Sequence, residues 1–159
     1  MSRKLLLLAI AIAALAAPIT LAACGDDDDD SGEEPTAESS GPTEVTLTAD
    51  DAGGEYTFDL SETPTADTKT VVFENNGSEP HALVYAKINE GYTLDEANEL
   101  QGRKGSAVVY IQDGASPGQT KTFQIDKPIE PGDYAMLCPI ESPEGPHYKL
   151  GQLEEFTIE

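Results

Sequence analysis

One cysteine and two histidines are the residues in this sequence whose types best suit metal chemistry. Cys138 lies far along the chain from His81, and His81 and His147 are the only histidines. Two imidazoles and one thiolate form a trigonal set that holds copper, with a weak fourth ligand on the axis. Zinc also binds cysteine and histidine, but it prefers four firm tetrahedral ligands. Because the sequence provides only three strong ligands, this combination of cysteine and histidine favours copper over zinc.

The strands that carry Cys138 and His81 are predicted to aim both side chains at one end of a β-structure. Tyr134, Met136 and Cys138 alternate onto one face of a strand, so the sulfur points inward near the end of that strand. His81 opens a strand of its own after the turn segment 75–80. Both residues therefore sit at strand ends rather than in mid-strand.

His147 and Gln152 follow in the last part of the chain. A proline-rich loop, 139–147, leads from Cys138 to His147, and the chain then returns as a last strand. Gln152 shares a face of that strand with Ile158, which is predicted to face the core. We therefore expect Cys138, His147 and Gln152 to converge at one end of the fold.

Cys138 also allows simpler interpretations. If the second cysteine, Cys24, carries a lipid anchor, Cys138 has no disulfide partner in an oxidising compartment. A buried and inert thiol is one alternative. A thiol nucleophile paired with His147 is another, but an inward-facing cysteine is not the exposed, activated thiol that such catalysis requires. No phosphate loop, serine triad or paired-carboxylate motif is visible in the sequence. We therefore do not expect this protein to be an enzyme.

The pattern around these residues predicts an all-β fold. Short segments alternate apolar and polar residues, and Gly- and Pro-containing turns separate them, which indicates a β-sandwich or barrel of about eight strands. The predicted strands lie near 45–47, 56–60, 70–74, 81–87, 107–111, 120–125, 134–138 and 153–158.

One short helix is predicted to interrupt the strands. Thr93 followed by Glu96 forms a capping box. Leu94 and Ala97 have helical spacing, and the helix is expected to end near Gly102.

The first residues of the chain predict export. The apolar run 5–17 is shorter than the ~20 residues needed to span a bilayer, so 1–23 is interpreted as a signal peptide. Leu-Ala-Ala-Cys at 21–24 resembles the lipobox of bacterial lipoproteins. That resemblance implies a lipid on Cys24, which would tether the chain to the outer face of the cell membrane.

The remaining chain divides into a linker and one domain. The segment 24–43 is rich in Asp, Glu, Gly, Pro and Ser and has few apolar side chains, so we expect a disordered acidic linker before a domain at 44–159. The chain carries thirty acidic and nine basic residues, a net charge of −21. That charge excludes nucleic acid and would suit a basic redox partner protein, although it also simply keeps a surface protein soluble. We expect a monomer.

Three segments of the domain resemble the cupredoxin family, and plastocyanin-like domains in particular. Asn75-Asn76-Gly77-Ser78-Glu79-Pro80-His81 is similar to the segment that carries the first histidine ligand of that family. The stretches 116–120 and 131–138 resemble those that lead to its cysteine ligand. The resemblance covers roughly 45–159, and only its ligand segments are specific.

This resemblance implies a Greek-key β-sandwich with one mononuclear type 1 copper site. His81, Cys138 and His147 carry over as equatorial ligands, and Gln152 stands where the axial methionine usually lies. Glutamine there is similar to the stellacyanin variant and implies a lower reduction potential. The eight residues between Cys138 and His147 exceed the usual spacing, and Ala82 replaces the asparagine that plastocyanins carry after the first histidine.

The function expected from these features is the transfer of single electrons by a membrane-tethered copper protein. His147, on a loop near the surface, is the expected electron exit. A copper carrier or scavenger without a redox role is an alternative that uses the same ligands. A cupredoxin-shaped binding module without metal is a second alternative.

Overall fold

The structure is a computed structural model that describes residues 41–159 of the chain. The predicted signal peptide 1–23, the lipidation site Cys24 and most of the linker 24–43 lie outside the described residues. Within 41–159, no helix is long and apolar enough to cross a membrane.

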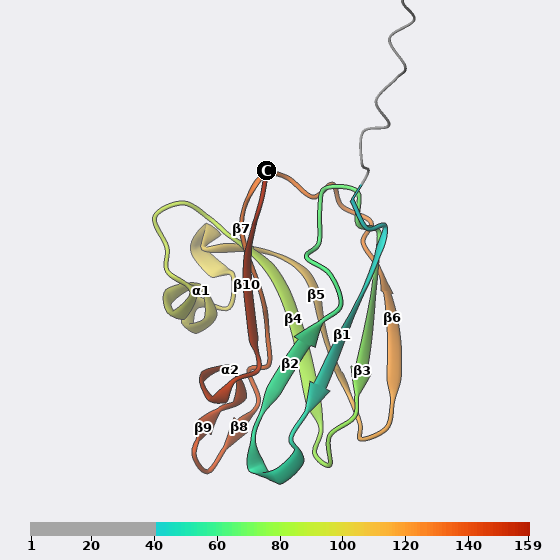
Figure 1. Cartoon of the computed structure of the whole chain (residues 1–159). Coiled ribbons are helices and arrows are strands. Elements are labelled where there is room, and N and C mark those ends of the chain that lie inside the picture. Colours follow the sequence, from blue (N-terminus) through green and yellow to red (C-terminus); the bar gives the residue numbers. More distant parts are fainter. Residues whose placement is uncertain (1–40) are drawn as a thin grey trace, which may run out of the picture. The chain divides into compact units, whose positions relative to one another are not determined.

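Eight main strands make up most of the described chain, and each matches a strand predicted from the sequence (Figure 1). They are β1 Glu44–Asp50, β2 Thr57–Leu60, β3 Thr70–Asn75, β4 His81–Ile88, β5 Ala107–Ala115, β6 Thr120–Gln124, β7 Gly132–Leu137 and β10 Leu153–Ile158. The sequence analysis missed the two-residue strands β8 Glu141–Ser142 and β9 Gly145–Pro146, and the short helix α2 His147–Leu150.

Two four-stranded sheets face each other, which confirms the predicted β-sandwich (Figure 1). One sheet has the order β2-β1-β3-β6 and the other β10-β7-β4-β5. β1 and β3 pair in parallel, whereas the other neighbours are antiparallel. The chain passes from one sheet to the other between β3 and β4, between β5 and β6, and between β6 and β7. Strand ends from both sheets therefore meet at each end of the sandwich.

The core lies between the two sheets because alternate residues of each strand point inward. In β1 the buried residues are Val45, Leu47 and Ala49, and in β3 they are Val71 and Phe73. The opposite sheet contributes apolar residues in the same alternation, and Cys138 belongs to this core cluster. The thiol is thus part of the packed core.

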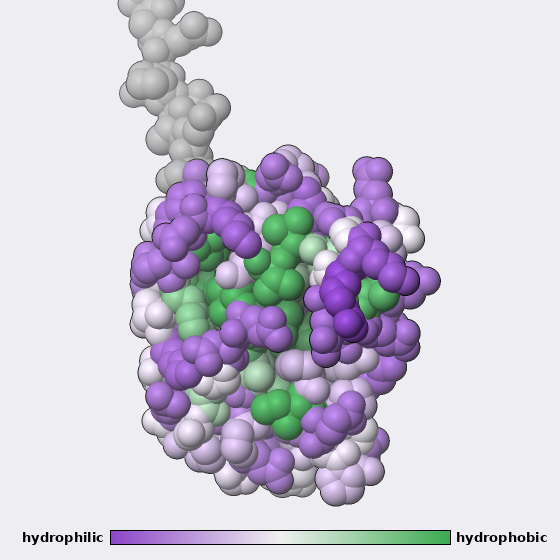
Figure 2. All heavy atoms as spheres, turned by 180° about the vertical axis from the view of Figure 1, so that it is seen from behind, coloured by the Kyte–Doolittle hydropathy of each residue, from purple (hydrophilic) through white to green (hydrophobic). Residues whose placement is uncertain are grey.

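The outer face of the β10-β7-β4-β5 sheet is also partly covered. Helix α1, Leu94–Leu100, begins with the predicted capping box, since Thr93 accepts from the Glu96 backbone and the Glu96 side chain accepts from Thr93. Leu94 packs on a second apolar cluster that includes Leu137 and Tyr148. Seen from behind, hydrophobic side chains gather in the middle of the molecule between hydrophilic borders (Figure 2). Central strand β7 is therefore buried on both faces, which holds the segment before Cys138 firmly.

Two core tyrosines allow a test of the packing. Within the described residues, the buried hydroxyl of Tyr85 has no hydrogen-bond partner, whereas the Tyr134 hydroxyl donates to the Glu130 carbonyl at 2.6 Å. We expect Tyr85→Phe to stabilise the fold by about 1 kcal/mol, because it removes an unsatisfied buried group. Tyr134→Phe should destabilise it by about 1 kcal/mol, because it leaves a carbonyl unpaired. Urea unfolding measures both, and equal effects of the two substitutions would contradict this packing.

Candidate metal centre

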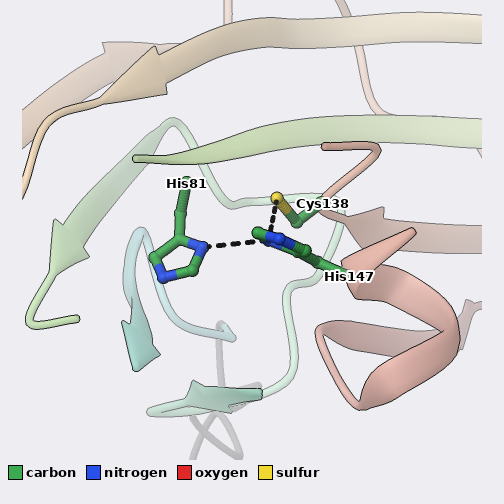
Figure 3. A group of neighbouring side chains, drawn as sticks. All are labelled: His81, Cys138 and His147. Atoms are coloured by element: carbon green, nitrogen blue, oxygen red, sulfur yellow. Dashed lines mark hydrogen bonds between the residues drawn. The ribbon is translucent and has the colours of Figure 1, made fainter. Parts of the chain in front are cut away.

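Three side chains that are distant in the sequence meet at one end of the sandwich (Figure 3). His81 is the first residue of β4, Cys138 directly follows β7, and His147 is the first residue of α2. His81 Nδ1 lies 3.3 Å from His147 Nδ1, and Cys138 Sγ lies 3.6 Å from the same His147 atom. All three residues are buried, with exposed fractions of at most 1%. The structure therefore brings together the three residues that the sequence singled out.

The loop before His81 is shaped by a buried asparagine at the end of β3. The Asn75 amide nitrogen donates to the carbonyl oxygens of Glu79 and Ala115, at 2.8 and 2.9 Å. The Asn75 side-chain oxygen accepts from the Gly77 backbone at 2.9 Å. Asparagine favours such turns because its short side chain can replace backbone partners. These bonds fix the loop, and the loop fixes where His81 enters the site.

The long segment between Cys138 and His147 folds back on itself. Strands β8 and β9 pair as a small hairpin, and α2 begins immediately after Pro146. The His147 backbone N–H donates to the Ile140 carbonyl at 2.9 Å, and the Tyr148 N–H donates to the Cys138 carbonyl at 3.0 Å. The additional residues are thus absorbed by the hairpin, and His147 returns beside Cys138 despite the unusual spacing.

Gln152 is fully buried beside the two histidines. Its Nε2 donates to the Asp50 carbonyl at 3.1 Å and lies 3.5 Å from His81 Nε2. Its side-chain oxygen has no partner within the described residues. Gly151 has a positive φ of 134°, and a Cβ there would collide with the Tyr56 carbonyl oxygen. Glycine is therefore required to let the chain place Gln152 in the site.

Asp51 is a functional candidate that the sequence analysis missed. Its carboxylate lies 3.2 Å from His81 Nε2, on the side of the ring away from the cluster, and its side chain is 7% exposed. The residue lies between the strands predicted near 45–47 and 56–60, and nothing in the sequence separates it from the other acidic residues. The contact appears only when the end of β1 and the loop before β4 come together in three dimensions.

Burial changes the protonation of these groups. Burial, followed by the nearby His147, lowers the pKa of His81, although Asp51 opposes the change. Burial raises the pKa of Cys138, and the backbone N–H groups of Ala82 and Ile140 act against that rise. Burial alone would raise the pKa of Asp51, but hydrogen bonds from Ser78 and Glu79 outweigh it and the pKa lies below its usual value. Burial thus favours the neutral form of His81 beside an ionised Asp51 carboxylate.

His147 differs from its expected place near the surface. It is 1% exposed, and the ring of Tyr56 covers it with a centroid distance of 4.2 Å. His147 Nε2 is buried without a hydrogen-bond partner in the described part of the chain. The prediction that His147 itself is the surface exit is therefore wrong. The cause is Tyr56, which precedes β2 and is distant from His147 in the sequence.

The sulfur of Cys138 receives a backbone hydrogen bond from β4. The Ala82 N–H donates to Cys138 Sγ at 3.2 Å. Alanine at this position offers no side-chain partner, so the backbone alone tethers the sulfur to β4. Such a bond favours the thiolate and fixes the direction of its lone pairs.

These residues fit a single mononuclear type 1 copper site. Atoms that bind one ion at about 2.0–2.3 Å must lie within about 4 Å of one another, and the spacings from His147 Nδ1 to His81 Nδ1 and to Cys138 Sγ, 3.3 and 3.6 Å, meet that condition. His147 Nδ1 faces both His81 Nδ1 and the sulfur of Cys138. One thiolate and two imidazoles in a buried pocket are the donor set of blue-copper sites. The unpartnered Gln152 oxygen supplies a candidate weak fourth ligand.

Comparisons with known proteins agree with this fold. No family model and no curated protein matches the chain. Among solved structures, reduced auracyanin from the photosynthetic bacterium Roseiflexus castenholzii is 24% identical, with 74% of this chain and 98% of that chain covered and a TM-score of 0.51. Auracyanin A of Chloroflexus aurantiacus, described as a "blue" copper protein, is 21% identical, with 73% and 99% covered and a TM-score of 0.49. The likeness to the first structure shows that the chain has the cupredoxin fold.

Proposed function

We propose that this chain is a type 1 copper protein that transfers single electrons. The observation that carries the proposal is the buried cluster of His81, Cys138 and His147, whose donor atoms lie within 4.8 Å of one another. Copper held there would supply a one-electron couple between Cu(II) and Cu(I). The chain itself would act as the rigid, dry holder of that couple, and this makes it an electron carrier rather than an enzyme.

The fold supports fast electron transfer because it holds the ligands still. Cys138 and His81 lie at the ends of adjacent β-strands, and the backbone of Cys138 donates to the Gln152 carbonyl at 3.1 Å. The Gln152 backbone in turn donates to the His147 carbonyl at 3.0 Å. Little rearrangement is then required when the charge of the bound ion changes by one.

Tyr56 is the proposed route from the site to the surface. Its ring lies against His147, and its hydroxyl donates to the Glu79 carboxylate at 3.3 Å. Glu55 and Glu144 line the shallow depression beside this tyrosine. The exit is therefore an aromatic ring among carboxylates, and a basic redox partner protein would be steered to it.

Electron transfer to a basic partner is directly testable. Reduced copper-loaded protein should be oxidised by a basic soluble cytochrome, and the bimolecular rate should fall steeply as ionic strength rises from low to physiological salt. Stopped-flow absorbance at the cytochrome band measures this rate. A copper-loaded protein that does not exchange electrons with any such cytochrome would contradict the electron-transfer proposal while leaving the copper site standing.

A role as copper carrier uses the same ligands, but the burial of the site speaks against it. Delivery requires the metal to leave quickly to an acceptor, and His147 is covered by Tyr56. A scaffold without metal would leave the Gln152 oxygen buried without a partner among the described residues. Each such orphaned polar atom costs about 1–3 kcal/mol. Electron transfer therefore agrees best with the geometry.

Gln152 offers a prediction on the reduction potential. Replacing Gln152 with methionine should raise the potential, because a thioether favours Cu(I) more than an amide oxygen does. We expect the ratio of Cu(I) affinity to Cu(II) affinity to rise by at least about tenfold. For a one-electron couple, this raises the reduction potential by about 59 mV. Redox titration of the visible band measures it. A lower potential in the variant would show that this side chain is not the axial ligand.

The place of action is part of the same proposal. A lipid on Cys24 would hold the domain at the outer face of the cell membrane, with the acidic segment 24–43 as a spacer. Mass spectrometry of the protein purified from bacterial membranes checks this directly. A mature chain that begins after Cys24, or one without diacylglycerol, would rule the anchor out.

A further inference from the structure

We infer that Asp51 is a positioning residue for the metal centre and acts through His81. Its carboxylate holds the imidazole with a proton on Nε2, so that Nδ1 is free to face the metal, and its charge favours Cu(II) over Cu(I). The inference rests on the copper site proposed above. It assigns a role to a residue that lies in the turn after β1 and does not itself reach the cluster.

The contact between Asp51 and His81 is buried and specific. Asp51 Oδ2 lies 3.2 Å from His81 Nε2, with side-chain exposures of 7% for the aspartate and 0% for the histidine. The other ring nitrogen, Nδ1, faces His147 at 3.3 Å. A carboxylate behind a metal-binding imidazole fixes its tautomer and orientation and makes the ring a stronger donor.

The carboxylate is itself held in place from three directions. Asp51 Oδ1 accepts from the backbone N–H of Ser78 at 2.7 Å and from its hydroxyl at 3.0 Å. Asp51 Oδ2 accepts from the Glu79 N–H at 2.8 Å as well as facing His81. An acceptor with four donors has little freedom to turn away, so the orientation of His81 is set in advance.

The backbone at Gly77 passes close to the contact between Asp51 and His81 and leaves no room for a side chain there. A Cβ on Gly77 would lie 2.7 Å from His81 Nε2 and 2.8 Å from Asp51 Oδ2, which is closer than atoms can approach. Only glycine therefore lets the loop cross over this contact. No water molecule would fit between the two groups at their separation of 3.2 Å.

Asp50, the residue before Asp51, holds the side chain of Gln152, the candidate fourth ligand, in a similar way. The Asp50 carbonyl accepts from Gln152 Nε2 at 3.1 Å, which leaves the Gln152 oxygen as the free end of the amide. The turn at 50–51 thus contacts the side chains of two proposed ligands, His81 through a carboxylate and Gln152 through a carbonyl. On the turn itself, only the Asp51 contact can be removed by substitution, because the Asp50 contact uses a backbone carbonyl.

The test compares two substitutions of Asp51 with a matched control in the full-length protein. Asp51→Asn removes the charge and Asp51→Ala also removes the hydrogen bond. Glu79→Gln removes a nearby negative charge that does not contact the imidazole. We expect both Asp51 variants to lose about 10–100-fold in Cu(II) affinity. Cu(I) affinity should fall less, so the reduction potential should rise by about 59 mV for each tenfold difference. Glu79→Gln should change the potential by much less.

The outcomes separate this inference from the proposed function. Wild-type protein that takes up no copper would end the proposed function. Copper-loaded Asp51 variants whose potentials match that of Glu79→Gln would overturn the inference and leave the copper site intact. If the variants do not fold, proton NMR of the Cu(I) wild-type protein decides. The Nε2 proton of His81 should lie well downfield of that of His147, whose Nε2 has no partner in residues 41–159, and equal positions would overturn the role of Asp51.

Discussion

Replacing Cys138 with serine should abolish the visible sulfur-to-copper absorption and nearly all Cu(II) binding. The thiolate is the one strong anionic ligand of the cluster, and serine offers a neutral hydroxyl at the same buried place. We expect the affinity to fall by at least about a thousandfold, which corresponds to about 4 kcal/mol. Metal analysis and the visible spectrum of the purified variant measure both effects.

A substitution nearby provides the control. Met136 lies two residues before Cys138, is fully buried and contributes to the same core cluster. Met136→Leu conserves volume, so it should cost less than about 1.5 kcal/mol and leave the copper spectrum unchanged. If Cys138→Ser and wild-type protein hold the same amount of copper, the thiol is only a packed core residue, and the account of the site fails.

Copper loading should stabilise the fold strongly. A ligand that binds only the folded state at a free concentration of a thousand times its Kd adds about 4.1 kcal/mol to the free energy of unfolding. The ligands come from the ends of β4 and β7 and from α2, so the site exists only when these elements are assembled. For a domain of this size, that gain raises Tm by on the order of 15 °C.

Differential scanning calorimetry of the apo and copper-loaded forms measures this shift. Cys138→Ser should show no rise in Tm with added Cu(II), because the site is lost while the fold remains. An equal rise in the wild-type protein and in the variant would mean that copper stabilises the fold through some other group, and the thiolate site would be contradicted.

The sequence predicted the sandwich and the metal-facing residues for a clear physical reason. The two-residue periodicity of a strand places Cys138 on the inward face, after Tyr134 and Met136. This periodicity is a local property of the sequence. The capping box at Thr93 is local as well, and it predicted the start of α1. Such features can be predicted from a few neighbouring residues.

Features that depend on distant segments were missed. The hairpin of β8 and β9 has two residues in each strand, which is too short for any periodicity to appear. The burial of His147 depends on Tyr56, which comes from the other sheet's connections. Asp51 is one of thirty acidic residues, and only its approach to His81 in three dimensions distinguishes it.

The measurement closest to the central claim is a Cu(II) titration of the purified protein, followed by metal analysis. We predict an intense blue colour that grows linearly and saturates at one copper per chain, as expected for one site built from a sulfur and two imidazoles. A folded protein that stays colourless and retains no copper after removal of excess ions would show that this buried trio does not bind copper.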